Sequence, residues 1–154
     1  MKRVTRVLFT TGVAAALAAG LSTSAHADGW VTWQHDVSGK CLGADSTIPF
    51  QPNDVRLYDY CTSYGAQWYE VYNGSDGTYL LEPKEDTGTC LAAYWDNDVY
   101  VEDCTAGNAY QRWYEVRTSD GWKLKHKATG RFIDSNGKDI YLHDENGGRY
   151  QLWH

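Results

Sequence analysis

The sequence predicts an all-β domain made of three repeats. A five-residue pattern, Ser/Thr-Gly-x-Cys/Phe-Leu/Ile, occurs at residues 38–42, 87–91 and 129–133. Each copy is followed by a stretch centred on a β-branched residue, namely Val55, Val99 and Ile140. A tryptophan then closes each copy, at Trp68, Trp113 and Trp153, with spacings of 45 and 40 residues. A period of this length indicates a repeat architecture.

The repeats themselves predict short strands. They run at about 30–73, 76–118 and 120–154 and are separated by turn-forming Asn, Asp and Gly residues. Segments rich in β-branched and aromatic residues predict strands, and they include 79–81, 99–101, 113–116 and 122–126. No segment keeps a helical period over ten residues. Three pseudo-repeats of four short strands predict a β-trefoil, in which the copies share one core.

The repeat-closing tryptophans are predicted to form that core. By their equivalence they should meet near the pseudo-threefold axis and pack with the apolar residue of each five-residue pattern. Those residues are Leu42, Leu91 and Ile133.

The first 27 residues have the features of a secretory signal peptide. A basic start is followed by an apolar run over 7–21 and by the small-x-small sequence Ala25-His26-Ala27. We therefore expect residues 1–27 to be removed and residues 28–154 to form a single secreted domain. No later run is long enough for a membrane span.

Charge excludes two classes of partner. Removing Lys2, Arg3 and Arg6 with the leader leaves 11 basic residues against 20 acidic ones, which moves the formal net charge from −6 to −9. Nucleic-acid binders need a basic surface, and anionic membranes attract one. We expect neither partner.

The four cysteines are expected to form two disulfides in an exported protein. Three pairings of four cysteines exist, but two cysteines fall in each of the first two repeats. We predict Cys41–Cys61 and Cys90–Cys104, each stabilising the fold by roughly 3 kcal/mol. The third repeat has Phe132 at the first of these positions. No Cys-x-x-Cys or histidine spacing indicates a metal site.

These residues resemble the ricin B-type β-trefoil lectins over essentially all of 30–154. The family has Gln-x-Trp near the end of each repeat, which stands here as Gln111-Arg112-Trp113 and Gln151-Leu152-Trp153. The first repeat departs from it, with Ala66 in place of the glutamine. The resemblance implies a non-catalytic carbohydrate-binding protein, although the family also includes toxin subunits and degenerate trefoils.

The third repeat is similar to those of actinohivin-type bacterial lectins over 130–136, 140–141 and 146–153. This resemblance implies that a glycan or polysaccharide, with mannose-type sugars among the classes considered, binds mainly in the third repeat. The site residues that it implies are Asp134, Tyr141, Asn146, Tyr150 and Gln151. The chain departs from these lectins in having His143 in place of a leucine and a shorter loop between the aspartate and the strand tyrosine.

The chemistry of this set suits a sugar. A carboxylate can accept hydrogen bonds from two neighbouring hydroxyls, an amide both donates and accepts, and aromatic rings pack on the C–H face. The first two repeats have Gly43 and Ala92 where the third has Asp134. Nearby Asp45 and Asp96 could compensate through a different loop. The alternative for the third repeat is that Asp134 caps a turn and the tyrosines pack.

Other functions are less well supported. The third repeat only faintly matches a calcium loop, because Lys138 and Asp139 occupy positions where the loop needs a ligand and a glycine. Glu70 and Glu115 occur in equivalent Trp-Tyr-Glu-Val segments, which favours a structural role, and no nucleophile motif is present. We therefore expect no enzyme, no cofactor and no metal. The alternative function is a degenerate trefoil that binds a secreted protein, as an inhibitor or a subunit of a secreted complex.

Overall fold

The computed structural model describes residues 28–45 and 54–154. The predicted leader, residues 1–27, lies outside the described residues. None of the helical segments in the described part of the chain is long and apolar enough to cross a membrane.

Each repeat has the same order of elements. Repeat one consists of β1 (Gly29–Val31), β2 (Cys41–Asp45), β3 (Asp54–Tyr58), the 3-10 turn η1 (Tyr64–Ala66) and β4 (Trp68–Asn73). Repeat two consists of β5 (Thr78–Pro83), β6 (Thr89–Ala93), β7 (Val99–Asp103), η2 (Ala109–Gln111) and β8 (Trp113–Arg117). Repeat three consists of β9 (Trp122–His126), β10 (Phe132–Ser135), β11 (Ile140–His143) and η3 (Arg149–Gln151).

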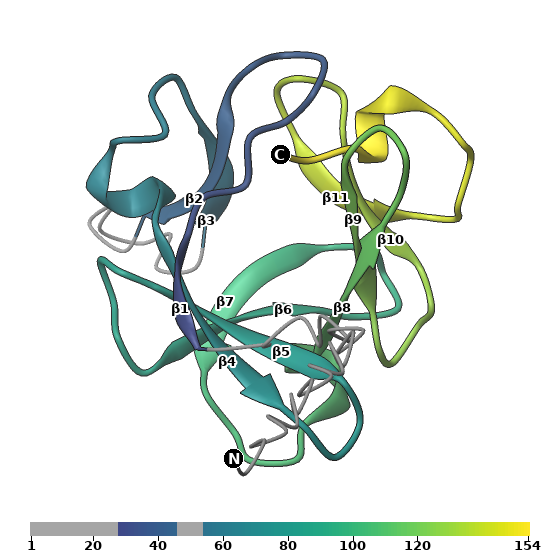
Figure 1. The fold of residues 1–154 in the computed structure, drawn as a ribbon. Helices are drawn as coiled ribbons and strands as arrows, with labels where there is room; N and C mark the ends of the chain where they lie inside the picture. Colours follow the sequence, from purple (N-terminus) through teal and green to yellow (C-terminus); the bar gives the residue numbers. More distant parts are fainter. Residues whose placement is uncertain (1–27, 46–53) are drawn as a thin grey trace, which may run out of the picture.

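The all-β fold with three repeats is confirmed, with one local difference. In repeat three the fourth strand is reduced to isolated bridges at Trp153, which pairs with Trp122 and with His35. The bridge to His35 joins the last repeat to the first, and the bridge to Trp122 closes repeat three on itself. Figure 1 shows the three repeats as three lobes around a common centre, with β1 and the C-terminal segment on neighbouring lobes.

Two kinds of pairing build the trefoil. The first and fourth strands of the repeats pair in the order β1-β4-β5-β8-β9. The second and third strands of each repeat form the antiparallel hairpins β2-β3, β6-β7 and β10-β11. The hairpin registers are equivalent, because Gly43 pairs with Arg56, Ala92 with Tyr100 and Asp134 with Tyr141. These registers put the three sequence-equivalent positions in the same place in each lobe.

The repeat-closing tryptophans are buried in one core, as predicted. Each is fully buried, and its indole N–H donates to the main-chain carbonyl of the apolar residue that follows the Cys or Phe of the same repeat. Trp68 donates to Leu42 at 2.9 Å, Trp113 to Leu91 at 2.9 Å and Trp153 to Ile133 at 3.4 Å. A buried indole N–H usually has a hydrogen-bond acceptor, and the repeat supplies the same acceptor three times.

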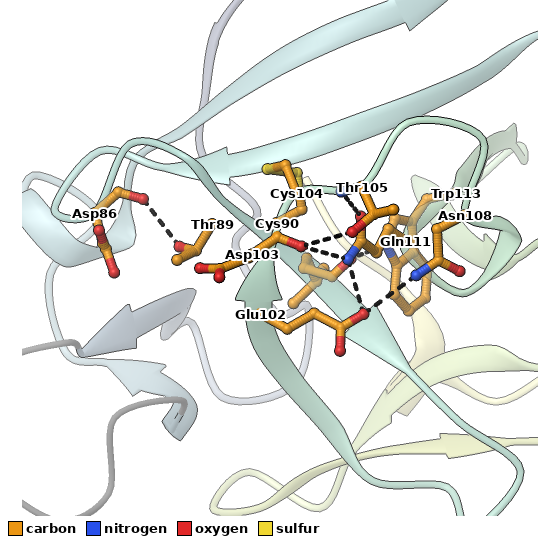
Figure 2. Close-up of a disulfide and its surroundings, with 11 residues drawn as sticks. Asp86, Thr89, Cys90, Glu102, Asp103, Cys104, Thr105, Asn108, Gln111 and Trp113 are labelled. Carbon is orange, nitrogen blue, oxygen red and sulfur yellow. Dashed lines mark hydrogen bonds between the residues drawn. A yellow bond between two sulfur atoms is a disulfide. The ribbon is translucent and has the colours of Figure 1, made fainter.

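Both predicted disulfides are confirmed. Cys41 bonds to Cys61 and Cys90 to Cys104, with Cα–Cα distances of 5.2 and 5.0 Å, within the usual range for disulfides. Figure 2 shows the second disulfide beside the loop that follows β7. Each disulfide therefore fastens the loop after the hairpin to the strand that begins it.

A buried carboxyl pair lies on β4 and β8. Glu70 is buried, and its side chain is hydrogen-bonded to Glu115 and lies against the indole of Trp33. Burial raises the pKa of Glu70 to about 9, and the charge and hydrogen bond of Glu115 contribute further. The folded protein therefore keeps a proton on this pair at neutral pH, where an exposed glutamate would be ionised.

This pair makes stability depend on pH. Because the folded state holds a proton that the unfolded chain releases above pH 4.5, the free energy of unfolding should fall as pH rises from about 4.5 to about 9. The slope should be at most about 1.4 kcal/mol per pH unit. Glu70→Gln, which cannot ionise, should flatten this dependence in urea unfolding measured from pH 5 to pH 9. Glu85→Gln, on the turn after β5, is the matched control, and an equal slope in wild type and Glu70→Gln would contradict the assignment.

Candidate functional site

Repeat three forms a shallow depression of about 260 Å³ on the outside of the β10-β11 hairpin. Four of the five sequence-predicted site residues line it, and two further residues complete the lining. The lining residues are Asp134, Asn136, Tyr141, His143, Asn146 and Tyr150. The hairpin register brings Asp134 and Tyr141 side by side. The loop before η3 adds Asn146 to the lining, and η3 itself adds Tyr150.

Asp134 is the centre of the site. Only 3% of the residue is exposed, yet its carboxylate lines the depression. Its Oδ2 accepts a hydrogen bond from Nδ2 of Asn146 at 3.2 Å. The Tyr141 hydroxyl also donates a hydrogen bond to the Asp134 carboxylate. A carboxylate has about four acceptor positions, so acceptor positions remain after these two bonds. Burial, followed by the Asp134 charge, raises the pKa of Tyr141, so this phenol stays a hydrogen-bond donor.

Gln151 shapes the site from behind. It is fully buried and is not among the lining residues. Its Nε2 donates to the Asp144 carbonyl at 2.9 Å, and its Oε1 accepts from the main-chain N–H of Asn146 at 3.4 Å. The structure thus places Gln151 as a staple that holds the loop carrying Asn146.

The equivalent glutamine of repeat two makes the same staple. Figure 2 shows the amide of Gln111 between the Asp103 carbonyl and the Thr105 N–H, at 2.9 and 2.8 Å. Its Nε2 also donates to Glu102 at 2.7 Å. In both repeats the glutamine of the Gln-x-Trp pattern therefore holds the loop before the 3-10 turn through main-chain hydrogen bonds.

Sequence reasoning did not assign Asn136 and His143 to the site. Asn136 follows Asp134 by two residues, and its Oδ1 accepts from the main-chain N–H groups of Lys138 and Asp139 at 2.9 and 2.7 Å. His143 pairs with Phe132 and so lies on the same face of the hairpin as Tyr141. Its Nδ1 is 2.8 Å from the Asp144 carbonyl, which assigns the proton to Nδ1 and leaves Nε2 as an acceptor in the neutral ring. Two-residue alternation along the hairpin was the signal that could have found both.

In repeat one the corresponding place is filled by Tyr58. A Cβ atom on Gly43 would lie 2.5 Å from the Tyr58 ring, and one on Gly65 would lie 2.3 Å from its hydroxyl. Gly43 and Gly65 are the equivalents of Asp134 and Tyr150, so the ring occupies the space of both side chains. The Tyr58 hydroxyl donates to the Ala44 carbonyl at 2.9 Å. Asp45 is ion-paired with Arg56 at 2.5 Å, so its carboxylate has a structural partner on the neighbouring strand.

In repeat two a tyrosine ring fills the corresponding place as well. Tyr94 is the equivalent of Asn136, and its ring stacks on Tyr110 at 4.3 Å and lies parallel to Tyr100 at 5.9 Å. Tyr100 and Tyr110 are the equivalents of Tyr141 and Tyr150. Ala92 stands where Asp134 does, and Asp96 accepts from the main-chain N–H of Asp98 at 3.2 Å. Both equivalent tyrosines, Tyr100 and Tyr110, are thus present in repeat two, and the ring of Tyr94 lies between them.

Among the described residues, the one cluster with metal-ligand proximity consists of Glu82, Cys90 and Cys104. The two cysteines form a disulfide, and a disulfide has no thiolate to offer a metal. This cluster therefore does not fit a metal ion.

Comparison with known proteins agrees with the fold. A family model described as ricin-type beta-trefoil lectin domain matches residues 29–153. A search of curated protein sequences finds no match to the chain. The designed threefold-symmetric protein ThreeFoil is similar at 25% identity, with a TM-score of 0.67 over 82% of this chain and 96% of that one. SeviL, solved bound to asialo-GM1 saccharide, is similar at 15% identity, with a TM-score of 0.67 over 82% and 95% of the two chains.

A mosquitocidal holotoxin is also similar, at 14% identity and a TM-score of 0.72, but the match covers 82% of this chain and only 17% of the toxin. At this identity the likeness concerns the fold of one domain. The family model, in contrast, matches most of the sequence, and a lectin domain points to carbohydrate binding. The chain belongs to the ricin-type β-trefoil lectin family.

Proposed function

We propose that this chain is an exported, non-catalytic lectin that binds a glycan mainly through the depression in repeat three. The observation that carries the proposal is the convergence of Asp134, Asn146, Tyr141 and Tyr150 on one open surface. Export is supported by the leader-like residues 1–27 and by the two disulfides, which persist in oxidising compartments.

The site supplies the interactions that a sugar needs. Asp134 offers acceptor positions to neighbouring hydroxyls, and a hydrogen bond to a charged group contributes about 1.5–3 kcal/mol. The rings of Tyr141 and Tyr150 offer flat surfaces for the C–H face, and Tyr150 is 48% exposed. His143 and Asn136 border the same space, so they are candidates for setting which hydroxyl arrangement fits.

The likeness of residues 130–136, 140–141 and 146–153 to actinohivin-type repeats supports mannose-type glycans as the first class to test. One shallow site of this kind should bind weakly, with Kd of about 0.1–1 mM or above. Useful avidity would then require clustering of the lectin or of the glycan.

A second candidate function is binding of a secreted protein partner. The observation that favours it is the filling of the equivalent places in repeats one and two by Tyr58 and Tyr94. A scaffold that has lost two of three sugar sites can serve a partner through its surface. Copurification of a stoichiometric secreted protein that sugars do not displace would favour this alternative.

Asp134→Ala tests the proposal directly. Removing the carboxylate should weaken glycan binding by about tenfold or more, since a hydrogen bond to a charged group contributes about 1.5–3 kcal/mol. Binding is measured on a glycan array and then by calorimetry with the best glycan. Asp96→Ala, the same change on the hairpin turn of repeat two, is the matched control and should bind as wild type does. If wild type and Asp134→Ala bind the same glycans equally, the site is assigned wrongly.

The filled place in repeat two allows a gain-of-function test. The double substitution Ala92→Asp and Tyr94→Asn should restore the carboxylate and remove the ring that lies against Tyr110, while Tyr100 and Tyr110 remain as walls. Calorimetry should then give two bound sugars per chain in place of one. Thermal unfolding checks that the variant is folded. A folded variant that still binds one sugar would show that the aspartate and the open space do not suffice.

A further inference from the structure

The repeat-three site lies against a junction with repeat one. His35, which follows β1 in the chain, is fully buried and reaches the main chain of Tyr150, 115 residues away. Its Nε2 is 3.2 Å from the Tyr150 carbonyl oxygen, and its Nδ1 is 2.9 Å from the Ser38 hydroxyl. Because a carbonyl can only accept, the proton is assigned to Nε2, and Nδ1 accepts from Ser38.

Asp36 adds a second connection at the same junction. Its carboxylate accepts from Nε of Arg149 at 2.5 Å and lies 2.9 Å from Nε2 of His154, and its main-chain N–H donates to the Leu152 carbonyl at 3.0 Å. Hydrogen bonds from Arg149 and His154 lower the pKa of Asp36 to about 2. Two adjacent residues of repeat one therefore hold the η3 turn from which Tyr150 projects.

We propose that His35 is a positioning residue of the repeat-three site, which fixes the main chain of Tyr150 and so sets the aromatic wall against which a saccharide packs. This inference rests on the proposed function. It means that the site is completed by the first repeat, although its lining residues all come from the third. A wall displaced by a fraction of an ångström loses contact with a ligand that is held by dispersion and by short hydrogen bonds.

The three junctions between repeats support this role. His126 has the same arrangement at the junction of repeats two and three, with Nδ1 2.9 Å from the Thr129 hydroxyl and Nε2 2.9 Å from the Tyr110 carbonyl. The register places Pro83 at the corresponding position of the remaining junction, opposite Trp68. There the turn residue is Gly65, which has no ring to position. A histidine thus occurs at the two junctions where the turn carries a tyrosine.

The surroundings of His35 keep it neutral. Burial lowers the pKa of His35, while the Tyr150 carbonyl and the charges of Asp134 and Asp36 raise it by smaller amounts. Its ring also lies 5.1 Å from the Trp153 ring and 6.1 Å from the Tyr150 ring. The neutral imidazole is therefore a fixed donor on one side and a fixed acceptor on the other.

Two conservative variants separate the roles of the two nitrogens. In His35→Gln the side-chain amide nitrogen can replace Nε2 and keep the bond to Tyr150, whereas in His35→Asn the shorter amide can replace Nδ1 and keep only the bond to Ser38. We expect His35→Gln to bind methyl α-mannoside and the best array glycan within about twofold of wild type, and His35→Asn to bind about fivefold more weakly, the value of one net hydrogen bond. His126→Asn is the matched control, because it should lose similar stability without losing affinity.

A measurement without ligand accompanies the affinities. With 13C-labelled tyrosine, His35→Asn should shift and broaden the ring resonances of Tyr150 and leave those of Tyr110 unchanged, and His126→Asn should do the reverse. Equal affinities of His35→Gln and His35→Asn, or an unchanged Tyr150 signal in His35→Asn, would overturn the positioning role. Glycan binding that persists in Asp134→Ala would instead overturn the proposed function, and the Tyr150 signal distinguishes the two failures.

Discussion

The hydrogen bond from each repeat-closing tryptophan to the carbonyl of the apolar residue in the same repeat holds the trefoil together. The donors are Trp68, Trp113 and Trp153, and the acceptors lie 26, 22 and 20 residues earlier in the chain. A buried indole whose N–H had no partner would destabilise the core by about 1–3 kcal/mol. Because the bond joins the end of a repeat to its hairpin, it fixes where the loop between them must lie. In repeat three that segment carries Asn146 and Tyr150.

The three repeats share one backbone arrangement, but the space beside the hairpin is occupied differently in each. In repeat three Gln151 holds the loop that carries Asn146, and Asp134 faces an open depression. In the other two repeats Gly43 and Ala92 stand at the position of Asp134, and a tyrosine ring lies in the corresponding space. Filling this space buries apolar ring surface that would otherwise be exposed. In these two repeats the absence of the carboxylate therefore goes together with the packing of a tyrosine ring.

Much of the fold could be predicted, and so could four of the six residues that line the candidate site. The spacing of the tryptophans predicted three repeats, and the position of Cys41, Cys61, Cys90 and Cys104 within them predicted both disulfides, because local order along the chain is repeated in space. Asp134 and Tyr141 come together because strand register is set by alternation. The fourth strand of repeat three was predicted, but only the bridges at Trp153 form.

The sequence by itself determined the period, the strands, the cysteine pairs and the residue types available to bind a ligand, since each follows from chemistry that acts over a few residues or recurs in every repeat. Only the tertiary structure decided that Gln151 lies behind the site, that Tyr58 and Tyr94 fill the equivalent spaces, and that His35 reaches Tyr150. Those outcomes depend on which side chains meet across hairpins and across the closing junction. The free energy of such contacts is set by packing and by hydrogen-bond geometry, which spacing along the chain does not encode.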